Sequence, residues 1–314
     1  MKTKQITILL PVYNGERYLA SALDSIRKQT FENFVCLILD DGSSDGTADI
    51  SRRAVESDER FRYIGFSNRG LVTTLNEGLS LVDTEWIARL DADDIMVSNR
   101  LERQLAFAQE NPHLSVAASY VKYIDDVGRI FGEGRSRFIS TEVVQEALRE
   151  GDLIGLHHPS VLARTSAMRR MNGYREEAWL AEDTDLWTRM AEHGMEILVQ
   201  REFLTYYRVH GSSVSRAKMR TQNEIVAWLK CCLDCRKQNR TEPTWQEFQK
   251  DQADQPWFVR MDRWRRECAK CLYKDATLSF ARQKFMRCGF QLLAASTLQP
   301  SHVWKQIRGR KIIK

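Results

Sequence analysis

Short apolar runs alternate with segments of helical hydrophobic spacing along the first third of the chain. The nearly continuous apolar runs are residues 6–12, 34–39, 61–66 and 86–90. The segments with apolar residues on one helical face are 18–26, 47–55, 71–82 and 98–107. Continuous apolar runs are typical of strands that are buried on both faces of a sheet. The alternation therefore predicts an α/β fold, in which a mostly parallel sheet lies between layers of helices.

The pattern becomes less regular after residue 110. We expect strands at residues 116–123, 196–199 and 204–209, and helices at 140–150, 164–171 and 182–193. An extended stretch at 152–162 contains histidine. From about residue 216 the pattern is helical and rich in tryptophan and basic residues. The sequence thus predicts an α/β domain over residues 1–215 and a helical, basic C-terminal region over 216–314.

Composition places the chain among globular proteins. Of its 314 residues 43% are hydrophobic and 28% are charged, which argues against disorder. The apolar runs are much shorter than the roughly 20 residues of a membrane span. Lys2 and Lys4 precede the first run, but no cleavage site of small residues follows it. Only Cys36 among seven cysteines precedes residue 231, which fits a reducing compartment, so we expect a cytoplasmic protein.

Charge is unevenly distributed. Residues 256–314 carry 14 Lys and Arg against three acidic residues, a net charge of +11, which leaves −6 for residues 1–255. Aromatic residues such as Trp257 and Trp264 are interleaved with these basic residues. This pattern favours an anionic membrane surface as a partner, with the protein peripheral on the inner face of the cell membrane. The alternative is a helical subdomain whose solvated face happens to be basic. No recognition motif supports nucleic-acid binding.

The C-terminal region also holds two Cys-x-x-Cys pairs, at Cys232 and Cys235 and at Cys268 and Cys271. Zinc binding is one interpretation. However, the 32 residues between the pairs exceed the usual spacing of zinc ribbons, and both pairs lie in helical sequence. Two small buried residues on a helix face would show the same spacing, and we favour that interpretation.

Polar clusters follow each of the first four predicted strands. They lie at residues 11–14, 40–47, 68–70 and 91–94. In open α/β sheets, ligands bind outside the carboxyl ends of the strands. One such cluster is ordinary turn chemistry, but four at one sheet edge predict a binding site.

The Asp91-Ala92-Asp93 cluster offers two carboxylates just beyond a buried strand. Hard oxygen ligands of this kind suit Mg²⁺ or Mn²⁺ bridging a diphosphate. The alternative is a solvated acidic turn that caps the next helix. His210, which follows a predicted strand, could supply an imidazole ligand to the same metal ion.

Two further acidic segments allow both a structural and a functional interpretation. The loop at residues 40–47 has ordinary turn composition, but a carboxylate there could accept a hydrogen bond from a uracil N–H, with Tyr13 stacked on the base. The acids that open the helix at residue 182 are favoured by the helix dipole. One of them could instead be a general base that activates a hydroxyl nucleophile.

Taken in order, these motifs resemble those of family 2 glycosyltransferases. The resemblance is carried by residues 12–19, 40–47, 68–70, 76–78, 91–94, 182–183 and 207–210. It covers roughly residues 5–215. It implies a nucleotide-diphospho-sugar transferase fold of the GT-A type, with inversion at the anomeric carbon.

The resemblance also implies roles for individual residues. Pro11, Tyr13 and Asp41 would line a uracil pocket, and Asp183 would be the base that deprotonates the acceptor. The wider nucleotide-sugar site would include Val12, Glu16, Arg69, Asp91 and Ala92. Asp93 would bind the metal ion, with Asp91 and His210 as further ligands.

One departure from the family pattern concerns processivity. The Gln-x-x-Arg-Trp signature of processive polysaccharide synthases is absent, and Trp187-Thr188-Arg189 follows Asp183 instead. We therefore expect metal-dependent transfer of a single sugar from a UDP-sugar to a saccharide or lipid-linked saccharide. One alternative is a nucleotidyltransferase of related fold, but residues 11–17 contain a single glycine and a single basic residue, Gly15 and Arg17, which is poor for a loop that binds a triphosphate. The other alternative is a nucleotide-sugar-binding protein without transferase activity.

Overall fold

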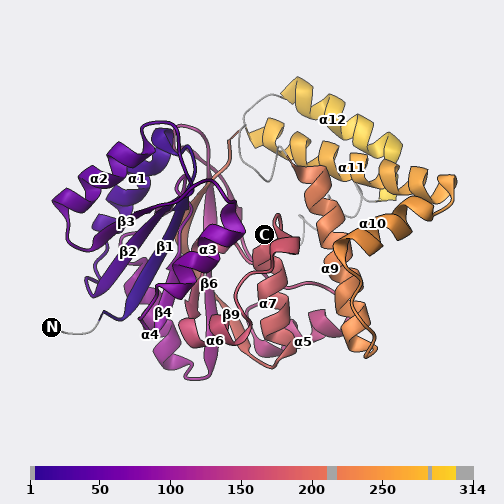
Figure 1. Ribbon diagram of the computed structural model, residues 1–314. Coiled ribbons are helices and arrows are strands. Elements are labelled where there is room, and N and C mark those ends of the chain that lie inside the picture. The colour runs from indigo at the N-terminus through magenta and orange to yellow at the C-terminus, as the bar shows by residue number, and fades with distance from the viewer. Residues whose placement is uncertain (1–3, 211–217, 282–284, 302–314) are drawn as a thin grey trace. The chain divides into compact units, whose positions relative to one another are not determined.

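The computed structural model describes residues 4–210, 218–281 and 285–301 (Figure 1). The chain divides into two units, Met1–His210 and Gly211–Lys314. The described part of the first unit is built on a mixed sheet of nine strands, whereas that of the second is helical. The predicted α/β body and the helical C-terminal region are both present.

The first four strands form the parallel half of the sheet, in the order β3-β2-β1-β4. These strands are β1 (Ile6–Val12), β2 (Phe34–Asp40), β3 (Phe61–Gly65) and β4 (Trp86–Arg89). The helices between them are α1 (Glu16–Arg27), α2 (Thr47–Ser57) and α3 (Leu71–Ser80). Every residue of β1 and β2 is buried, because helices cover both faces of the sheet. This double covering accounts for the continuous apolar runs.

The second half of the sheet is mixed, in the order β8-β6-β9-β5, with β7 paired to β6. Its strands are β5 (Ile95–Met96), β6 (Leu114–Ile124), β7 (Ile130–Gly134), β8 (Leu162–Arg164) and β9 (Glu196–Arg208). The accompanying helices are α4 (Arg100–Glu110), α5 (Thr141–Arg149), α6 (Thr165–Arg170) and α7 (Glu182–Glu192), with short 3₁₀ turns η1 (His158–Ser160) and η2 (Glu176–Ala178). The pairs of β8 with β4 and β6 are antiparallel, and β6 and β9 run parallel.

The prediction of two separate strands at 196–199 and 204–209 is wrong, because β9 is one continuous strand. Its register with β6 jumps from Ser119–Gln200 to Tyr120–Phe203, so Arg201 and Glu202 bulge out of the ladder. Those two polar residues interrupt the apolar pattern without ending the strand.

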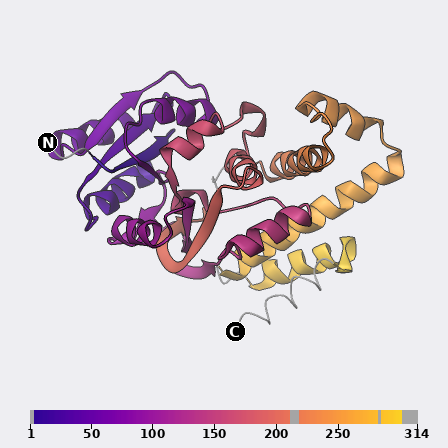
Figure 2. The ribbon, with the colours of Figure 1, turned by 90° about the horizontal axis from the view of Figure 1, so that it is seen from below.

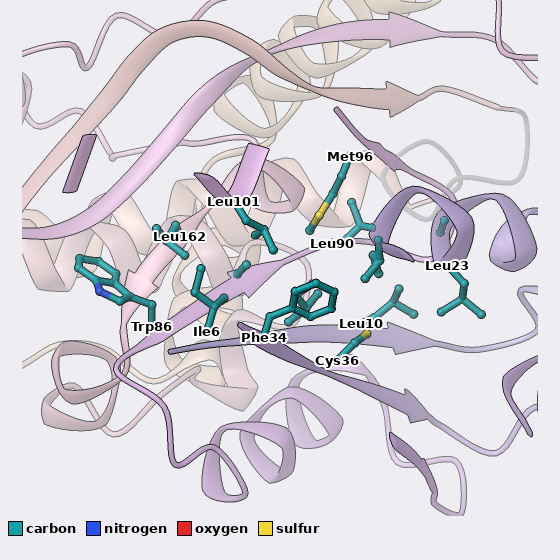
Figure 3. Close-up of a cluster of buried hydrophobic side chains, with 14 of the residues drawn as sticks. Ile6, Leu10, Leu23, Phe34, Cys36, Trp86, Leu90, Met96, Leu101 and Leu162 are labelled. Atoms are coloured by element: carbon teal, nitrogen blue, oxygen red, sulfur yellow. The ribbon is translucent and has the colours of Figure 1, made fainter. Parts of the chain in front are cut away.

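The main core lies on one face of the sheet (Figure 3). Alternate residues of the parallel strands, such as Ile6, Leu10 and Phe34, point to that face and pack with Leu23 of α1 and Leu101 of α4. Full burial of each such side chain stabilises the fold by about 1.5–3 kcal/mol. On the other face, α3 approaches the sheet so closely that a Cβ at Gly78 would lie 2.4 Å from Leu39 Cδ1.

Two arginines, Arg89 and Arg100, are buried to 1% and 0% exposure behind the ends of these strands. Arg100 Nη2 donates to the carbonyl oxygens of Arg89 at 3.0 Å and Val161 at 3.1 Å, and Nη1 donates to Pro159 O. Burial and the nearby charge of Arg89 lower the pKa of Arg100 to about 9, so it stays charged at neutral pH. This one side chain therefore ties α4 to β4 and to the segment that leads into β8.

The second unit contains four described helices (Figure 2). They are α9 (Met219–Lys237), α10 (Trp245–Asp254), α11 (Trp257–Ala281) and α12 (Phe285–Leu298). Cys232 and Cys235 are buried in α9, while Cys268 and Cys271 lie half-buried on α11. Within the described ranges, no three or more His, Cys, Asp or Glu side chains gather closely enough to hold a metal ion. None of the described helices combines the length and hydropathy that a bilayer span requires.

We predict that Arg100→Met lowers the free energy of unfolding by about 3 kcal/mol, because buried carbonyl oxygens lose a charged donor. Urea denaturation measures the change. Arg52→Met is the matched control, since Arg52 pairs with Asp49 on the exposed surface of α2. Its effect should stay within about 0.5 kcal/mol. Equal effects of the two substitutions would show that Arg100 does not hold these segments together.

Candidate active site

The loops that follow β1 and β2 are fastened to each other by hydrogen bonds. Asn14 N donates to Ser43 Oγ at 2.9 Å, and Asn14 Oδ1 accepts from Ser44 N at 2.8 Å. Asn14 adopts a left-handed backbone conformation with φ of 49°, which asparagine tolerates better than most residues. Glu16 Oε2 accepts from Gly46 N at 3.1 Å. Glu16, expected at the nucleotide-sugar site, thus also braces the loop after β2.

Asp41 joins the loop after β2 to the loop after β3. Its Oδ1 accepts from Arg69 N and Thr74 Oγ1, and its Oδ2 accepts from Gly70 N, each at 2.9 Å. The residue is 6% exposed. A carboxylate oxygen can accept two hydrogen bonds, so Oδ2 keeps the capacity for one more donor. Asp41 therefore holds the start of α3 and retains one acceptor position for a ligand.

Around Asp41, the other residues expected at a uracil pocket differ in exposure. The Tyr13 side chain is 55% exposed at the end of β1, whereas Pro11 and Val12 are buried in that strand. The Arg69 guanidinium lies 4.1 Å from the ring centre of Phe66. Tyr13 and Arg69 thus offer accessible side-chain surface, while Pro11 and Val12 contribute mainly to the shape of the strand end.

Ala92 lies against the start of α1. A Cβ added at Gly15 would stand 3.7 Å from Ala92 Cβ and 2.5 Å from Val12 Cγ2. The Asp91-Ala92-Asp93 turn is therefore packed directly beside the end of β1, as expected if the strand ends share one site.

Arg89 holds the Asp91-Ala92-Asp93 turn in place through hydrogen bonds. Its Nη1 donates to the carbonyl oxygens of Leu9 and Leu90 at 2.9 Å, and its Nη2 donates to Asp91 Oδ1 at 2.6 Å. Its Nε donates to His158 Nε2 at 3.1 Å. A guanidinium can only donate, so His158 must be neutral with its proton on Nδ1. Burial, followed by the charge of Arg89, lowers the pKa of His158 well below its usual range.

The end of β9 contacts the same turn from the other side. His210 Nε2 lies 2.8 Å from Asp93 Oδ2. Arg208 donates from its backbone N to Asp94 Oδ1 at 2.6 Å and from Nε to Asp93 O at 2.8 Å. Burial and the charges of its acidic neighbours raise the pKa of Asp94 well above its usual range. The Tyr18 ring centre stands 5.2 Å from that of His210, and the buried Tyr18 hydroxyl has no partner among the described residues.

Asp93 and His210 are the two side chains best arranged for a divalent cation. Their facing oxygen and nitrogen atoms share a hydrogen bond at a position that a cation could take in place of the proton. Asp91 Oδ1 is already occupied by Arg89. Because the described part of the chain has no cluster of three or more candidate ligands, diphosphate and water oxygens would have to complete the shell. Mg²⁺ and Mn²⁺ are suited to few protein ligands of this kind.

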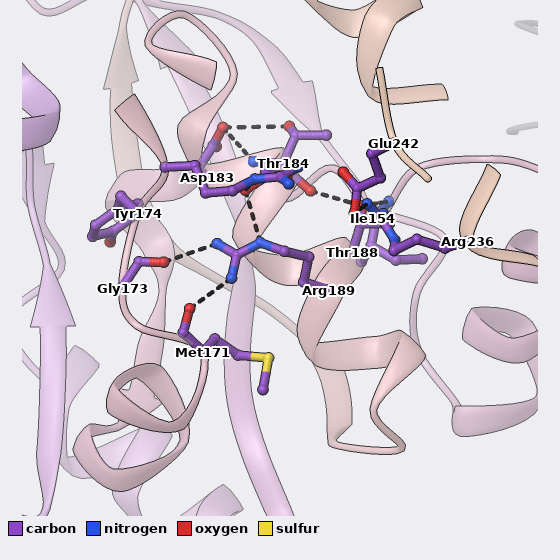
Figure 4. A network of polar contacts seen from close by, with 12 residues as sticks. Ile154, Met171, Gly173, Tyr174, Asp183, Thr184, Thr188, Arg189, Arg236 and Glu242 are labelled. Atoms are coloured by element: carbon purple, nitrogen blue, oxygen red, sulfur yellow. Dashed lines mark hydrogen bonds and ion pairs between the residues drawn. The ribbon is translucent and has the colours of Figure 1, made fainter. Parts of the chain in front are cut away.

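Asp183 stands in the first turn of α7 (Figure 4). Its Oδ1 accepts from Thr184 N at 2.6 Å. Burial raises the pKa of Asp183 to about 6, and the charge of Asp91 adds to this shift, while the Thr184 bonds and Arg89 oppose it. Burial and the Asp183 charge raise the pKa of Glu182 to about 8. The influence of Asp91 on Asp183 means that the two carboxylates share one electrostatic environment.

The start of α7 is held by an ion-pair network behind Asp183. The buried Asp185 accepts from Arg175 Nε at 3.0 Å and from Arg189 Nε at 2.8 Å. Arg189 also donates to the carbonyl oxygens of Met171 at 2.7 Å and Gly173 at 2.8 Å (Figure 4). These bonds fix α7 against the preceding loop and thereby orient Asp183.

Asp91 and Asp93 lie in one turn and contact Arg89 and His210, respectively, and the negative charge of Asp91 contributes to the raised pKa of Asp183. The sequence did not single out Arg89 or Arg208, which orient these groups. Arg89 had a recognisable signal, because it is a charged residue inside the apolar run at 86–90. A charge within a buried strand must find partners, and an acidic turn follows immediately.

Comparison with known proteins gives a consistent result. Residues 7–171 match the family described as "Glycosyl transferase family 2". "Putative glycosyltransferase EpsE" of Bacillus subtilis is 29% identical over 233 residues, which are 72% of this chain and 82% of that protein. An "Uncharacterized glycosyltransferase" of Haemophilus influenzae is 27% identical over 72% of each chain.

Two groups of solved structures share the fold. The structure of S. aureus TarS in complex with UDP-GlcNAc matches with a TM-score of 0.58 and 18% identity, over 94% of this chain and 92% of that one. The mannosyltransferase PcManGT from Pyrobaculum calidifontis in complex with GDP-Man and Mn²⁺ gives a TM-score of 0.57 at 15% identity, over 95% and 88%. Both are GT-A glycosyltransferases, so the expected GT-A fold is confirmed.

We predict that Asp41→Asn speeds hydrogen exchange at the amides of Arg69 and Gly70 about tenfold or more, because an amide accepts fewer and weaker hydrogen bonds than a carboxylate. Exchange mass spectrometry over the loop after β3 measures this. Asp49→Asn on exposed α2 is the control and should leave that loop unchanged. Unchanged exchange in Asp41→Asn would mean that other contacts hold the loop.

Proposed function

The chain belongs to glycosyl transferase family 2, and from this membership we propose that its first unit transfers one sugar from a UDP-sugar to an acceptor hydroxyl. The acceptor in this proposal is a saccharide or a lipid-linked saccharide, the latter met at a membrane surface. The observation that carries the proposal is the Asp91-Ala92-Asp93 turn at the carboxyl end of β4, where Arg89 Nη2 donates to Asp91 Oδ1 and His210 Nε2 lies 2.8 Å from Asp93 Oδ2. Membership of the family favours sugar transfer over nucleotidyl transfer or simple nucleotide-sugar binding.

The donor would bind across the loops after β1, β2 and β3. Tyr13 offers an exposed ring for stacking on the base, and the remaining acceptor position of Asp41 Oδ2 suits the N–H of uracil. Arg69 supplies a positive charge near the nucleotide, and Asp91 lies toward the ribose or phosphates. TarS has been solved with UDP-GlcNAc and PcManGT with GDP-Man, so a donor test must include both nucleotides.

Asp93 and His210 would hold a divalent cation, Mg²⁺ or Mn²⁺, together with the diphosphate of the donor. When bound, the cation neutralises charge that develops on the leaving diphosphate. Arg89 orients Asp91 beside this position, and Arg208 fixes the backbone of the turn through Asp93 O. The chain's own contribution is thus a rigid acidic turn with two well-placed ligand atoms.

Asp183 would act as the general base. Its carboxylate accepts the proton of the acceptor hydroxyl while the oxygen attacks the anomeric carbon and the bond to UDP breaks on the opposite side, which inverts that carbon. A pKa of about 6 leaves Asp183 mostly ionised at pH 7, yet makes it a stronger base than an ordinary carboxylate. Glu182, with a pKa of about 8, stays mostly protonated and adds little negative charge.

We predict that Asp183→Asn lowers the rate of transfer about 10²–10⁴-fold, the range for loss of a general base. Donor affinity should stay within about twofold, because an isosteric amide alters neither the strand-end loops nor Asp93. A panel of UDP- and GDP-sugars first identifies the donor, and nucleoside diphosphate release then measures the rate. Glu142→Gln, in the exposed first turn of α5, is the matched control.

The same assay has a pH signature. A carboxyl group with a raised pKa of about 6 becomes ionised as the pH rises through that value. The wild-type rate should therefore climb between about pH 5 and 7 and then level off. Transfer by a folded Asp183→Asn variant at the wild-type rate would remove Asp183 as the base. No response of the folded wild-type protein to any nucleotide sugar would contradict the proposed reaction itself.

We predict that Asp93→Ala removes most of the metal dependence of donor binding, with a loss of about tenfold or more in affinity when Mn²⁺ is present. Calorimetric titration with UDP, with Mn²⁺ or with EDTA, measures this. Asp83→Ala, at the opposite end of β4, is the control because Asp83 is exposed. If Asp93→Ala keeps the wild-type response to Mn²⁺, Asp93 does not hold the metal ion.

A further inference from the structure

The start of α11 exposes a stripe of large apolar side chains. Trp257, Met261 and Trp264 are 75%, 54% and 47% exposed. Their spacing of four and then three residues puts them on one face of the helix. Basic residues such as Arg260 lie between them. Trp next to basic residues is typical of helices that lie in a membrane interface.

Helix α12 is apolar on two opposite faces. On one face, Ala295 and Leu292 pack against Tyr273 and Leu272 of α11. The other face carries three large apolar side chains that are exposed to between 64% and 81%. They are Met286, Phe290 and Leu293. Arg287 is the single charged residue of this helix. Packing on α11 explains one apolar face, while the large side chains of the other face remain mostly exposed.

Exposed apolar surface of this extent on two neighbouring helices indicates an interaction site. The charge of the region decides between partners. Residues 256–314 carry a net charge of +11, so a second copy would bring like charge against like charge. An anionic bilayer offers both the apolar phase and the opposite charge. A helix that lies flat in the interface needs no membrane span, in agreement with the hydropathy of the described helices.

We propose that the exposed face of α12, with the aromatic stripe at the start of α11, docks on an anionic lipid bilayer. Met286, Phe290 and Leu293 enter the boundary between headgroups and acyl chains, while neighbouring basic residues contact the lipid phosphates. The inference rests on the proposed function in one respect only, namely that docking would bring the enzyme to the surface that carries a lipid-linked acceptor. Docking itself requires neither nucleotide nor metal.

The test is co-sedimentation of the full chain with vesicles. Wild-type protein should bind vesicles of equal parts phosphatidylcholine and phosphatidylglycerol about tenfold or more better than vesicles of phosphatidylcholine alone. The double variant Phe290→Ser/Leu293→Ser should lose about tenfold or more of that binding. Val127→Ser/Ile130→Ser is the matched control, because these side chains are 68% and 54% exposed in the first unit. It should bind like the wild type.

Three results would overturn the proposal. The first is equal binding of the wild-type protein to both kinds of vesicle. The second is equal vesicle binding by Phe290→Ser/Leu293→Ser and the control variant. The third is loss of a dimer by Phe290→Ser/Leu293→Ser while its vesicle binding is unchanged. The last result would identify the face as a contact between copies. Where the variant and the control bind vesicles equally, a lower urea midpoint of the variant would indicate that the chain itself covers the face. Release of UDP from soluble donor should be unchanged in both variants, so failure of docking and failure of the transfer reaction are separately visible.

Discussion

The buried guanidinium of Arg89 constrains how β1, the turn after β4 and η1 are arranged. A charge buried to 1% exposure is tolerated only when its donors are satisfied, and here they reach Leu9, Leu90, Asp91 and His158. These partners come from β1, from the turn after β4 and from η1. The carbonyl oxygen of Arg89 in turn accepts from Arg100. The hydrogen bonds of these two arginines thus hold three chain segments together. The acidic turn of the site is attached directly to this arrangement.

The electrostatics of the site are set mainly by burial, and Arg89 moderates them. Raised pKa values at Asp91, Asp94, Glu182 and Asp183 all have burial as their main cause, and the mutual repulsion of the carboxylates adds to it. The positive charge of Arg89 opposes this at Asp91 and Asp183. The site thus gathers carboxylates whose negative charges raise one another's pKa values, and α7 is held beside them by the bonds of Arg175 and Arg189 to Asp185. In the proposed function, a cation bound with a nucleotide would offset this negative charge.

The sequence predicted the structure best where a single physical requirement determines which residues are apolar or polar. Strands β1 and β2 are buried on both faces, so their apolar runs were unambiguous, and the acidic turn after β4 followed from its place at a strand end. Predictions failed where two requirements compete. The bulge at Arg201 and Glu202 hides the continuity of β9, and β8 is too short to show any periodicity. The contacts that orient the site, from Arg89 and Arg208, depend on segments distant in sequence, which no local pattern reports.

The three residues of β8 have a consequence for how the molecule is made. This strand lies between β4 and β6, although it follows both in the chain. It therefore joins the parallel half of the sheet to the mixed half, and until Leu162–Arg164 has left the ribosome both neighbouring strands keep an open edge. Open edges pair readily with other chains. Strand β8 can therefore join the two half-sheets only after residue 164 has been synthesised, and the family match over residues 7–171 ends just after this strand.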